Sequence, residues 1–210
     1  MGKIICLDAG HGGKDSGAIL SSRFEKNDTL RMVFAIKAEL IKQGFTVILT
    51  RDSDEYVSLQ ERSNFANQKK ADYFISIHRN AFSLAIANGV ENWIYERTDA
   101  QTQKAAELIL NEVVGVGVQS NRGVKRGNFH VTRETTMPAC LLELNFISNP
   151  KDNELFDKNF EGYAKAICKG ICKFFNYSYK DQTQSEQTQS EQTQPDQTQS
   201  EQTQPKPPIE

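Results

Sequence analysis

Two spacings of apolar residues alternate along the first 175 positions of the chain. Short apolar and β-branched runs are typical of buried strands, whereas apolar residues that recur every three or four positions are typical of helices. The first spacing predicts strands at 3–7, 45–50, 72–78, 90–95 and 139–146, and a further short strand is expected at 129–132. Strands that alternate with helices indicate an α/β domain with a largely parallel sheet and helices on both faces.

Capping residues mark where the helices begin. Ser58 and Glu61 form a capping box, and Asn149 followed by Pro150 is a typical helix opening. The predicted helices run from Asn27 to Gly44, from Ser58 onward, from Thr98 to about Val114, and from Asn149 to about Phe175 as one helix or as two. Apolar residues recur at helical spacing in the first helix, at Leu30, Val33, Phe34, Leu40 and Ile41, and the second is expected to bury Leu59, Phe65 and Ala66.

The C-terminal segment has a different composition. From Gln182 the chain repeats a five-residue unit of the type Thr-Gln-Ser-Glu-Gln, which offers almost no apolar surface. Such a segment cannot offset the entropy lost on ordering, so we expect it to be disordered. The predicted organisation is one globular domain over 1–178 and a disordered linker or tail over 179–210.

The tail also dominates the charge balance. The whole chain has a formal net charge of −2, but residues 1–180 hold 24 basic and 21 acidic side chains. A mildly basic domain is compatible with an acidic polymer as target, although an ordinary mixed surface gives the same balance. No nucleic-acid partner is predicted.

The chain shows no targeting or membrane signal. No stretch approaches the roughly 18 consecutive apolar residues of a membrane span, and the first residues enter a strand without a cleavable leader pattern. We therefore expect synthesis in the cytoplasm without a signal peptide and no membrane insertion. The four cysteines form no Cys-x-x-Cys pair, which favours buried reduced thiols.

Two of the three histidines stand where predicted strands end. His11 lies in a glycine-rich segment, 8–15, after the first strand, and His78 closes the strand 72–78. The carboxyl ends of parallel strands are where α/β proteins place their sites. Two imidazoles in one cleft suggest zinc, which in catalytic sites takes three protein ligands. The spacing leaves the third ligand open among Asp8, Asp15, Glu25 and Asp28.

Three further side chains carry expectations. Asp8 is expected to hydrogen-bond the glycine loop or a histidine ring in support of the metal ligands. Glu143 interrupts the apolar strand 139–146, where an ionised carboxylate is costly unless it is paired or near a metal. This position indicates a general base beside a metal-bound water, with a structural ion pair or an exposed side chain as the alternatives. His130 is expected to be exposed or hydrogen-bonded without a catalytic role.

Six segments in order resemble one enzyme family. These segments are 8–15, 25–27, 50–52, 76–81, 121–125 and 137–149. Together they are similar to the zinc-dependent N-acetylmuramoyl-L-alanine amidases of bacterial cell-wall hydrolases and phage endolysins. The resemblance extends from about residue 3 to 175, which is essentially the whole predicted domain.

The resemblance implies a fold, a site and a reaction. It implies a twisted, mostly parallel sheet of about six strands, one zinc ion bound by His11, Glu25 and His78, and Glu143 as the catalytic carboxylate. The implied reaction hydrolyses the amide between N-acetylmuramic acid and L-alanine in peptidoglycan, by a monomeric catalytic domain that acts at the cell wall after secretion or lysis. Two positions depart from the family: Arg79 replaces a small residue and Asn145 replaces glycine.

The residues alone leave other functions open. Another zinc hydrolase that acts on peptidoglycan, such as a deacetylase or a peptidase, would need the same metal-assisted chemistry. A non-catalytic wall-binding module on a repeat linker would need neither the metal nor the Glu143 carboxylate. We also expect a positively charged Arg79 to bind a carboxylate of the peptide stem or to form a surface salt bridge.

Overall fold

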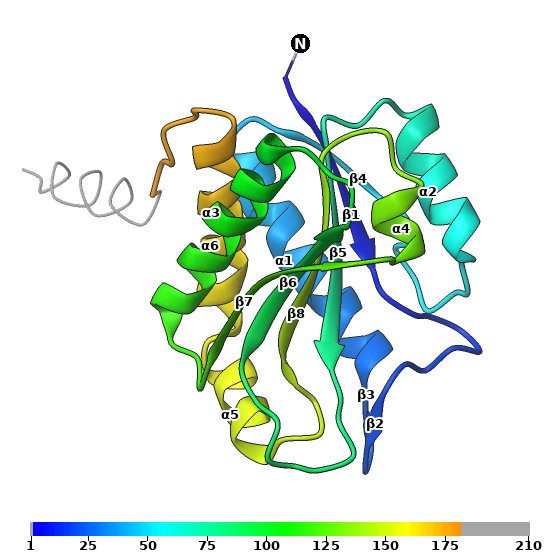
Figure 1. Cartoon of the computed structure of the whole chain (residues 1–210), viewed down its shortest axis with the longest axis vertical. Coiled ribbons are helices and arrows are strands. Elements are labelled where there is room, and N and C mark those ends of the chain that lie inside the picture. Colours follow the sequence, from blue (N-terminus) through cyan, green and yellow to red (C-terminus); the bar gives the residue numbers. More distant parts are fainter. Residues whose placement is uncertain (1, 182–210) are drawn as a thin grey trace, which may run out of the picture. The chain divides into compact units, whose positions relative to one another are not determined.

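The computed structural model describes residues 2–181, so nearly all of the predicted tail lies outside the described residues. One six-stranded sheet organises the domain (Figure 1), in the order β4-β1-β5-β8-β6-β7. The strands are β1 (Ile4–Ala9), β4 (Thr46–Leu49), β5 (Tyr73–Asn80), β6 (Val90–Tyr95), β7 (Asn121–Gly127) and β8 (Ala139–Phe146). The first four in sheet order are parallel, whereas β6 is antiparallel to β8 and parallel to β7. The predicted six-stranded, mostly parallel sheet is therefore confirmed.

Helices cover both faces of the sheet, as predicted. The elements α1 (Glu25–Lys42), α3 (Ala100–Val116) and α6 (Phe160–Phe174) pack on one face, where the larger apolar core lies. The short helices α2 (Leu59–Gln68) and α4 (His130–Arg133) cover the other face over a smaller apolar cluster. The last helix, α5 (Pro150–Lys158), follows β8 and precedes α6. The two faces therefore differ in how thickly they are covered (Figure 1).

The helix boundaries follow local chemistry. Ser58 accepts the backbone N–H of Glu61, whose carboxylate accepts the Ser58 N–H, which completes the predicted capping box of α2. Asn149 caps α5 by accepting the Asp152 N–H. The helix α3 is capped by Asp99, one residue after the expected Thr98. The last predicted helical segment divides at Asn159 into α5 and α6.

Two predictions about elements and burial were wrong, and two elements were not predicted. Residues 129–132 form the start of α4, and the missed strand is β7, whose sequence Asn-Arg-Gly-Val-Lys-Arg-Gly offers a single large apolar residue and therefore no apolar period. The short hairpin β2 (Ile19–Leu20) with β3 (Arg23–Phe24) was not predicted. Leu59, which was expected to be buried, is exposed, and so are Phe34 and Ile41 at apolar positions of α1.

The structure also bears on the cysteines and on membrane-spanning helices. All four cysteines are buried and unbridged, as predicted. Within residues 2–181, no helix combines the length and apolar character that crossing a bilayer requires.

Candidate active site

A sharp loop at the end of β1 presents His11. The backbone of His11 is left-handed (φ 63°), and Gly12 has φ 131°, a conformation that side chains disfavour. A Cβ atom on Gly12 would lie 2.1 Å from the Glu55 carbonyl oxygen, and one on Gly10 would lie 2.4 Å from Cε1 of His78. Glycine at these positions therefore lets the loop pass under residues 54–56 and lets the His78 ring approach.

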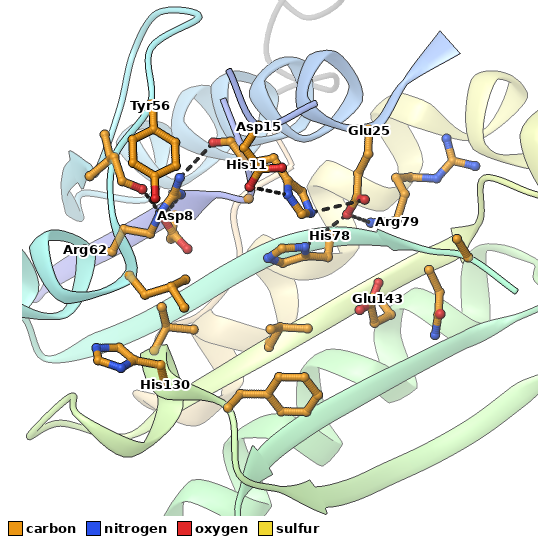
Figure 2. Close-up of a pocket in the computed structure, with 18 residues that line it drawn as sticks. Asp8, His11, Asp15, Glu25, Tyr56, Arg62, His78, Arg79, His130 and Glu143 are labelled. Atoms are coloured by element: carbon orange, nitrogen blue, oxygen red, sulfur yellow. Dashed lines mark hydrogen bonds and ion pairs between the residues drawn. The ribbon is translucent and has the colours of Figure 1, made fainter. Parts of the chain in front are cut away.

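Two histidines and one glutamate converge from three elements (Figure 2). His11 comes from the loop after β1, Glu25 is the first residue of α1, and His78 lies in β5. Glu25 Oε2 lies 3.2 Å from His11 Nε2, and its Oε1 lies 3.0 Å from His78 Nδ1. One ligand atom from each residue lies within 4.8 Å of the others, so the three implied ligands are brought together.

The other candidate carboxylates have different partners. Asp15 Oδ2 lies 2.9 Å from His11 Nδ1, the ring nitrogen that faces away from Glu25. Asp28 forms an ion pair with Arg79. Among the four candidate carboxylates, only Glu25 contacts both histidines. This contact depends on how the chain folds, so spacing along the sequence could not select Glu25.

Asp8 supports the loop indirectly, so its predicted direct bond to the loop or a histidine ring was wrong. Its buried carboxylate accepts hydrogen bonds from Thr50, Ser76 and Arg62. The Arg62 guanidinium in turn donates to the carbonyl oxygens of Ala9 and His11. Arg62, which the sequence did not single out, therefore connects Asp8 to the His11 loop.

The three converging residues shift one another's pKa values. Burial raises the pKa of Glu25, but the hydrogen bonds and charges of His11 and His78 outweigh this effect and hold the pKa well below its usual range. Burial opposes protonation of His11, but Glu25 and Asp15 raise its pKa to about 9. The buried Glu25 carboxylate therefore stabilises protons on the two imidazoles, and a metal ion bound by these three residues would take the place of those protons.

Glu143 lies on β8 directly beside His78 of β5 (Figure 2). Burial is the main cause that raises its pKa to about 7, with Glu25 and Glu91 adding to the increase and His78 opposing it. Its Oε2 atom is enclosed and has no hydrogen-bond partner among residues 2–181. A carboxyl group with a near-neutral pKa and an unoccupied oxygen is suited to accept and release protons. The predicted alternatives of an ion pair and an exposed side chain do not describe this geometry.

The converging residues and Glu143 line a cavity of about 360 Å³. Part of its wall is apolar, and this part is formed by Tyr56, Val57, Leu59, Phe129, Val131 and Leu141. The sequence does not reveal this wall, because the helical period predicts Leu59 to be in the core, yet the residue is 56% exposed. His130 also lines the cavity, and its Nε2 lies 3.4 Å from Ser63 Oγ, which agrees with the expected hydrogen-bonded role.

The two departures from the family have structural explanations. The Arg79 side chain is 1% exposed and donates to Asp28 and Asn153, so it is neither a surface salt bridge nor free to bind a stem carboxylate. Asn145 has φ 65°, a left-handed conformation that glycine favours and that asparagine tolerates better than most other residues. Asparagine at this position therefore retains the backbone path of a glycine.

The α/β fold and this cleft define a hydrolytic enzyme with a candidate metal centre. The chain belongs to the N-acetylmuramoyl-L-alanine amidase family, whose sequence pattern matches residues 5–173. The family resemblance and the enzymatic class predicted from the sequence are confirmed.

Relatives of known name and known structure agree. The N-acetylmuramoyl-L-alanine amidase CwlM of Bacillus licheniformis is 39% identical over 178 residues, which are 83% of this chain and 69% of the relative. The sporulation-specific N-acetylmuramoyl-L-alanine amidase of Bacillus subtilis is 39% identical, with 82% of this chain and 68% of the relative covered. The solved catalytic domain of the amidase CwlV from Paenibacillus polymyxa superposes with a TM-score of 0.78 at 35% identity and covers 84% of this chain and 99% of that one. The crystal structure of an N-acetylmuramoyl-L-alanine amidase from Clostridium difficile superposes with a TM-score of 0.80 at 31% identity and covers 83% of this chain and 97% of that one.

Proposed function

We propose that this chain is a zinc-dependent amidase that hydrolyses the bond between N-acetylmuramic acid and L-alanine in peptidoglycan. The observation that carries the proposal is the convergence of His11, Glu25 and His78 within 4.8 Å, beside Glu143 in the same cavity. Peptidoglycan is the proposed partner and the bacterial cell wall the proposed place of action, in line with the family. A monomeric catalytic domain remains a prediction.

The residues present fit one zinc ion. Two imidazole nitrogens and one carboxylate are the donor set of a catalytic zinc site, which keeps a position for water. His11 has the supporting contact typical of such ligands, because its second ring nitrogen faces Asp15 at 2.9 Å. When bound, zinc lowers the pKa of water and polarises a carbonyl group.

Glu143 is the residue that moves protons in the proposed reaction. Its unpartnered Oε2 accepts a proton from the attacking water as the oxygen bonds to the amide carbon. The same carboxyl group then delivers that proton to the nitrogen of the departing alanine as the C–N bond breaks. A pKa of about 7 suits both transfers near neutral pH.

The apolar wall of the cavity has a separate role in this proposal. Leu59 and Phe129 are exposed large apolar side chains that line the same cavity. Apolar walls with a few convergent polar groups are typical of ligand sites. We infer that this wall contacts the apolar parts of the substrate near the scissile amide.

One digestion experiment tests the reaction and separates it from the alternatives. Purified walls are treated with the wild type and with Glu143→Gln, and the new end groups are identified. The proposal expects new alanine amino termini from the wild type and almost none from the variant. New glucosamine amines would indicate a deacetylase, internal stem amines a peptidase, and no new amines a binding module. Equal release by both proteins would exclude Glu143 from the proposed role.

A second measurement tests the metal. The purified wild type is expected to hold one zinc ion per chain by elemental analysis after equilibration with zinc. His78→Ala should retain the fold and lose the stoichiometric ion. A wild type that holds no zinc under these conditions contradicts the zinc proposal whatever its activity.

A further inference from the structure

A buried ion pair joins the two elements that carry His78 and Glu25. Arg79 follows His78 on β5, and Asp28 lies on α1 one helical turn after Glu25. Arg79 Nη1 lies 2.6 Å from Asp28 Oδ2, and the two side chains are only 1% and 7% exposed. The pair therefore links the neighbours of two proposed zinc ligands across the interior.

Other contacts fix the guanidinium in one position. Arg79 Nη2 donates to Asn153 Oδ1 at 2.6 Å, and its Cζ atom lies 4.0 Å from the ring centroid of Phe156, with both partners on α5. Asp28 also accepts a hydrogen bond from Arg23 Nε at 2.6 Å. Arg79 is thus held between α1 and α5, which leaves its side chain little freedom to move along β5.

The backbone of Arg79 contacts a proposed ligand directly. Its N–H donates to Glu25 Oε1 at 2.9 Å, and this is the same oxygen that faces His78 Nδ1. Movement of the 78–79 peptide would therefore change the position of the Glu25 carboxylate and of the His78 ring together. The side-chain contacts of Arg79 oppose that movement.

Stability alone does not account well for this ion pair. Burying two charges carries a desolvation cost that their attraction often only balances, so apolar replacements of similar volume are frequently neutral or stabilising. Arg79 Nε is also buried without a hydrogen-bond partner in the described part of the chain, which adds to the cost. An ion pair that need not stabilise the fold but that fixes geometry next to a site is consistent with a role in the site.

We propose that Arg79 and Asp28 form a positioning pair that holds Glu25 and His78 at the spacing required for metal binding. The inference rests on the proposed zinc site and deepens it. Arg79 lines the cavity, but its guanidinium is held by Asp28 and Asn153, so in this proposal both residues of the pair act through the two ligands beside them.

The test compares zinc affinity with fold stability in the full chain. Arg79→Met retains much of the side-chain volume without the charge, and Asp28→Asn is nearly isosteric. Competition with a chromophoric chelator should show a zinc Kd raised about tenfold in each variant, the lower end of what loss of supporting contacts around metal ligands costs. The cobalt-substituted variants should show an altered visible absorption spectrum, because the ligand positions change.

Two further variants separate positioning from general destabilisation. Val113→Ala removes buried volume from α3, away from the site, and should lower the melting temperature without changing zinc Kd or the cobalt spectrum. Arg79→Lys keeps a positive charge near Asp28 and should restore part of the affinity. If Arg79→Met does not fold, Asp28→Asn decides the comparison.

The outcomes distinguish this inference from the proposed function. A wild type that binds no zinc overturns the proposed zinc site and the pair's role with it. A wild type that binds one zinc ion, with Kd and cobalt spectrum unchanged in Arg79→Met and Asp28→Asn, overturns the positioning role alone. Loss of affinity in Val113→Ala equal to that in Arg79→Met would also overturn it.

Discussion

Glu143 and Glu91 lie opposite each other on the antiparallel strands β8 and β6, so two carboxylates occupy neighbouring positions on one sheet face. Their environments differ. Glu91 accepts hydrogen bonds from Arg122, Lys125, Trp93 and Asn80, whereas Glu143 has one oxygen without a partner among residues 2–181. The paired carboxylate is suited to remain ionised, and the unpaired one is suited to exchange protons.

The first prediction concerns Glu91→Gln. Burial is the main cause of the raised pKa of Glu143, and the Glu91 charge contributes to it, so removing that charge should lower the pKa. A general base works in its deprotonated form, so the acidic limb of kcat/KM against pH should move to lower pH. Glu39→Gln is the matched control, because Glu39 is a buried acid paired with Lys42 on α1. An acidic limb that stays in place in Glu91→Gln contradicts the prediction.

The second prediction concerns the stability of the metal-free protein. The pKa of Glu143 is about 7 in the fold against an ordinary value of 4.5, so the native state binds the proton more tightly than the unfolded state. The fold is therefore favoured below pH 4.5, and this advantage is lost as the pH rises to 7. Since each pKa unit corresponds to about 1.4 kcal/mol, Glu143→Gln should gain stability relative to the wild type by an amount on the order of 3 kcal/mol between low and high pH. Urea unfolding in chelator at pH values below and above this window measures the gap, and a constant gap would argue against the raised pKa.

The third prediction concerns Asp15, which faces His11 Nδ1. Asp15→Asn should weaken zinc binding about tenfold, because a carboxylate on the far side of a ligating imidazole orients the ring and raises its basicity. Asp54→Asn is the control, because Asp54 supports the same loop through the Gly13 N–H and Lys26 without touching a histidine. Equal losses in the two variants would show that loop support alone, and not the contact with the ring, sets the affinity.

The fourth prediction concerns the apolar wall. Leu59 is 56% exposed, so Leu59→Ser should change the free energy of unfolding by no more than about 0.5 kcal/mol. It should nevertheless raise KM on wall fragments, because the side chain lines the cavity. Ile41→Ser, at 53% exposure on α1, is the matched control and should leave KM unchanged. A KM that is unaffected in Leu59→Ser would remove this wall from the substrate site.

The sequence predicted five of the six strands of the main sheet and missed one of its two edges. The central strands were found because they are buried on both faces and read as largely apolar runs, and the edge strand β4 was found because Thr46–Leu49 is also apolar and β-branched. The other edge strand, β7, was missed because Asn121–Gly127 is mostly glycine and charged residues with little burial, so its composition resembles that of a loop. Only the order of the known family motifs pointed to this segment.

Some residues of the candidate site could be selected from the sequence and others could not. His11 and His78 could be selected from their places at strand ends, and Glu143 from its charge in an apolar run. The third ligand could not, because the approach of Glu25 to His11 depends on the path of residues 12–24, which includes an unpredicted hairpin. The exposure of Leu59 also could not be predicted, because an amphipathic period gives the same pattern for a residue in the core and for one in the wall of a cleft.

The larger apolar core and the apolar wall of the cavity are built from different elements of the domain. Most of the buried apolar side chains lie under α1, α3 and α6, whereas the cavity draws its apolar wall from the loop before α2, from α2 and from the segment around α4. Replacement of the exposed side chains of this wall, such as Leu59 and Phe129, is therefore expected to cost the chain little of its folding free energy. The cavity and the main core can thus be altered by mutation largely independently of each other.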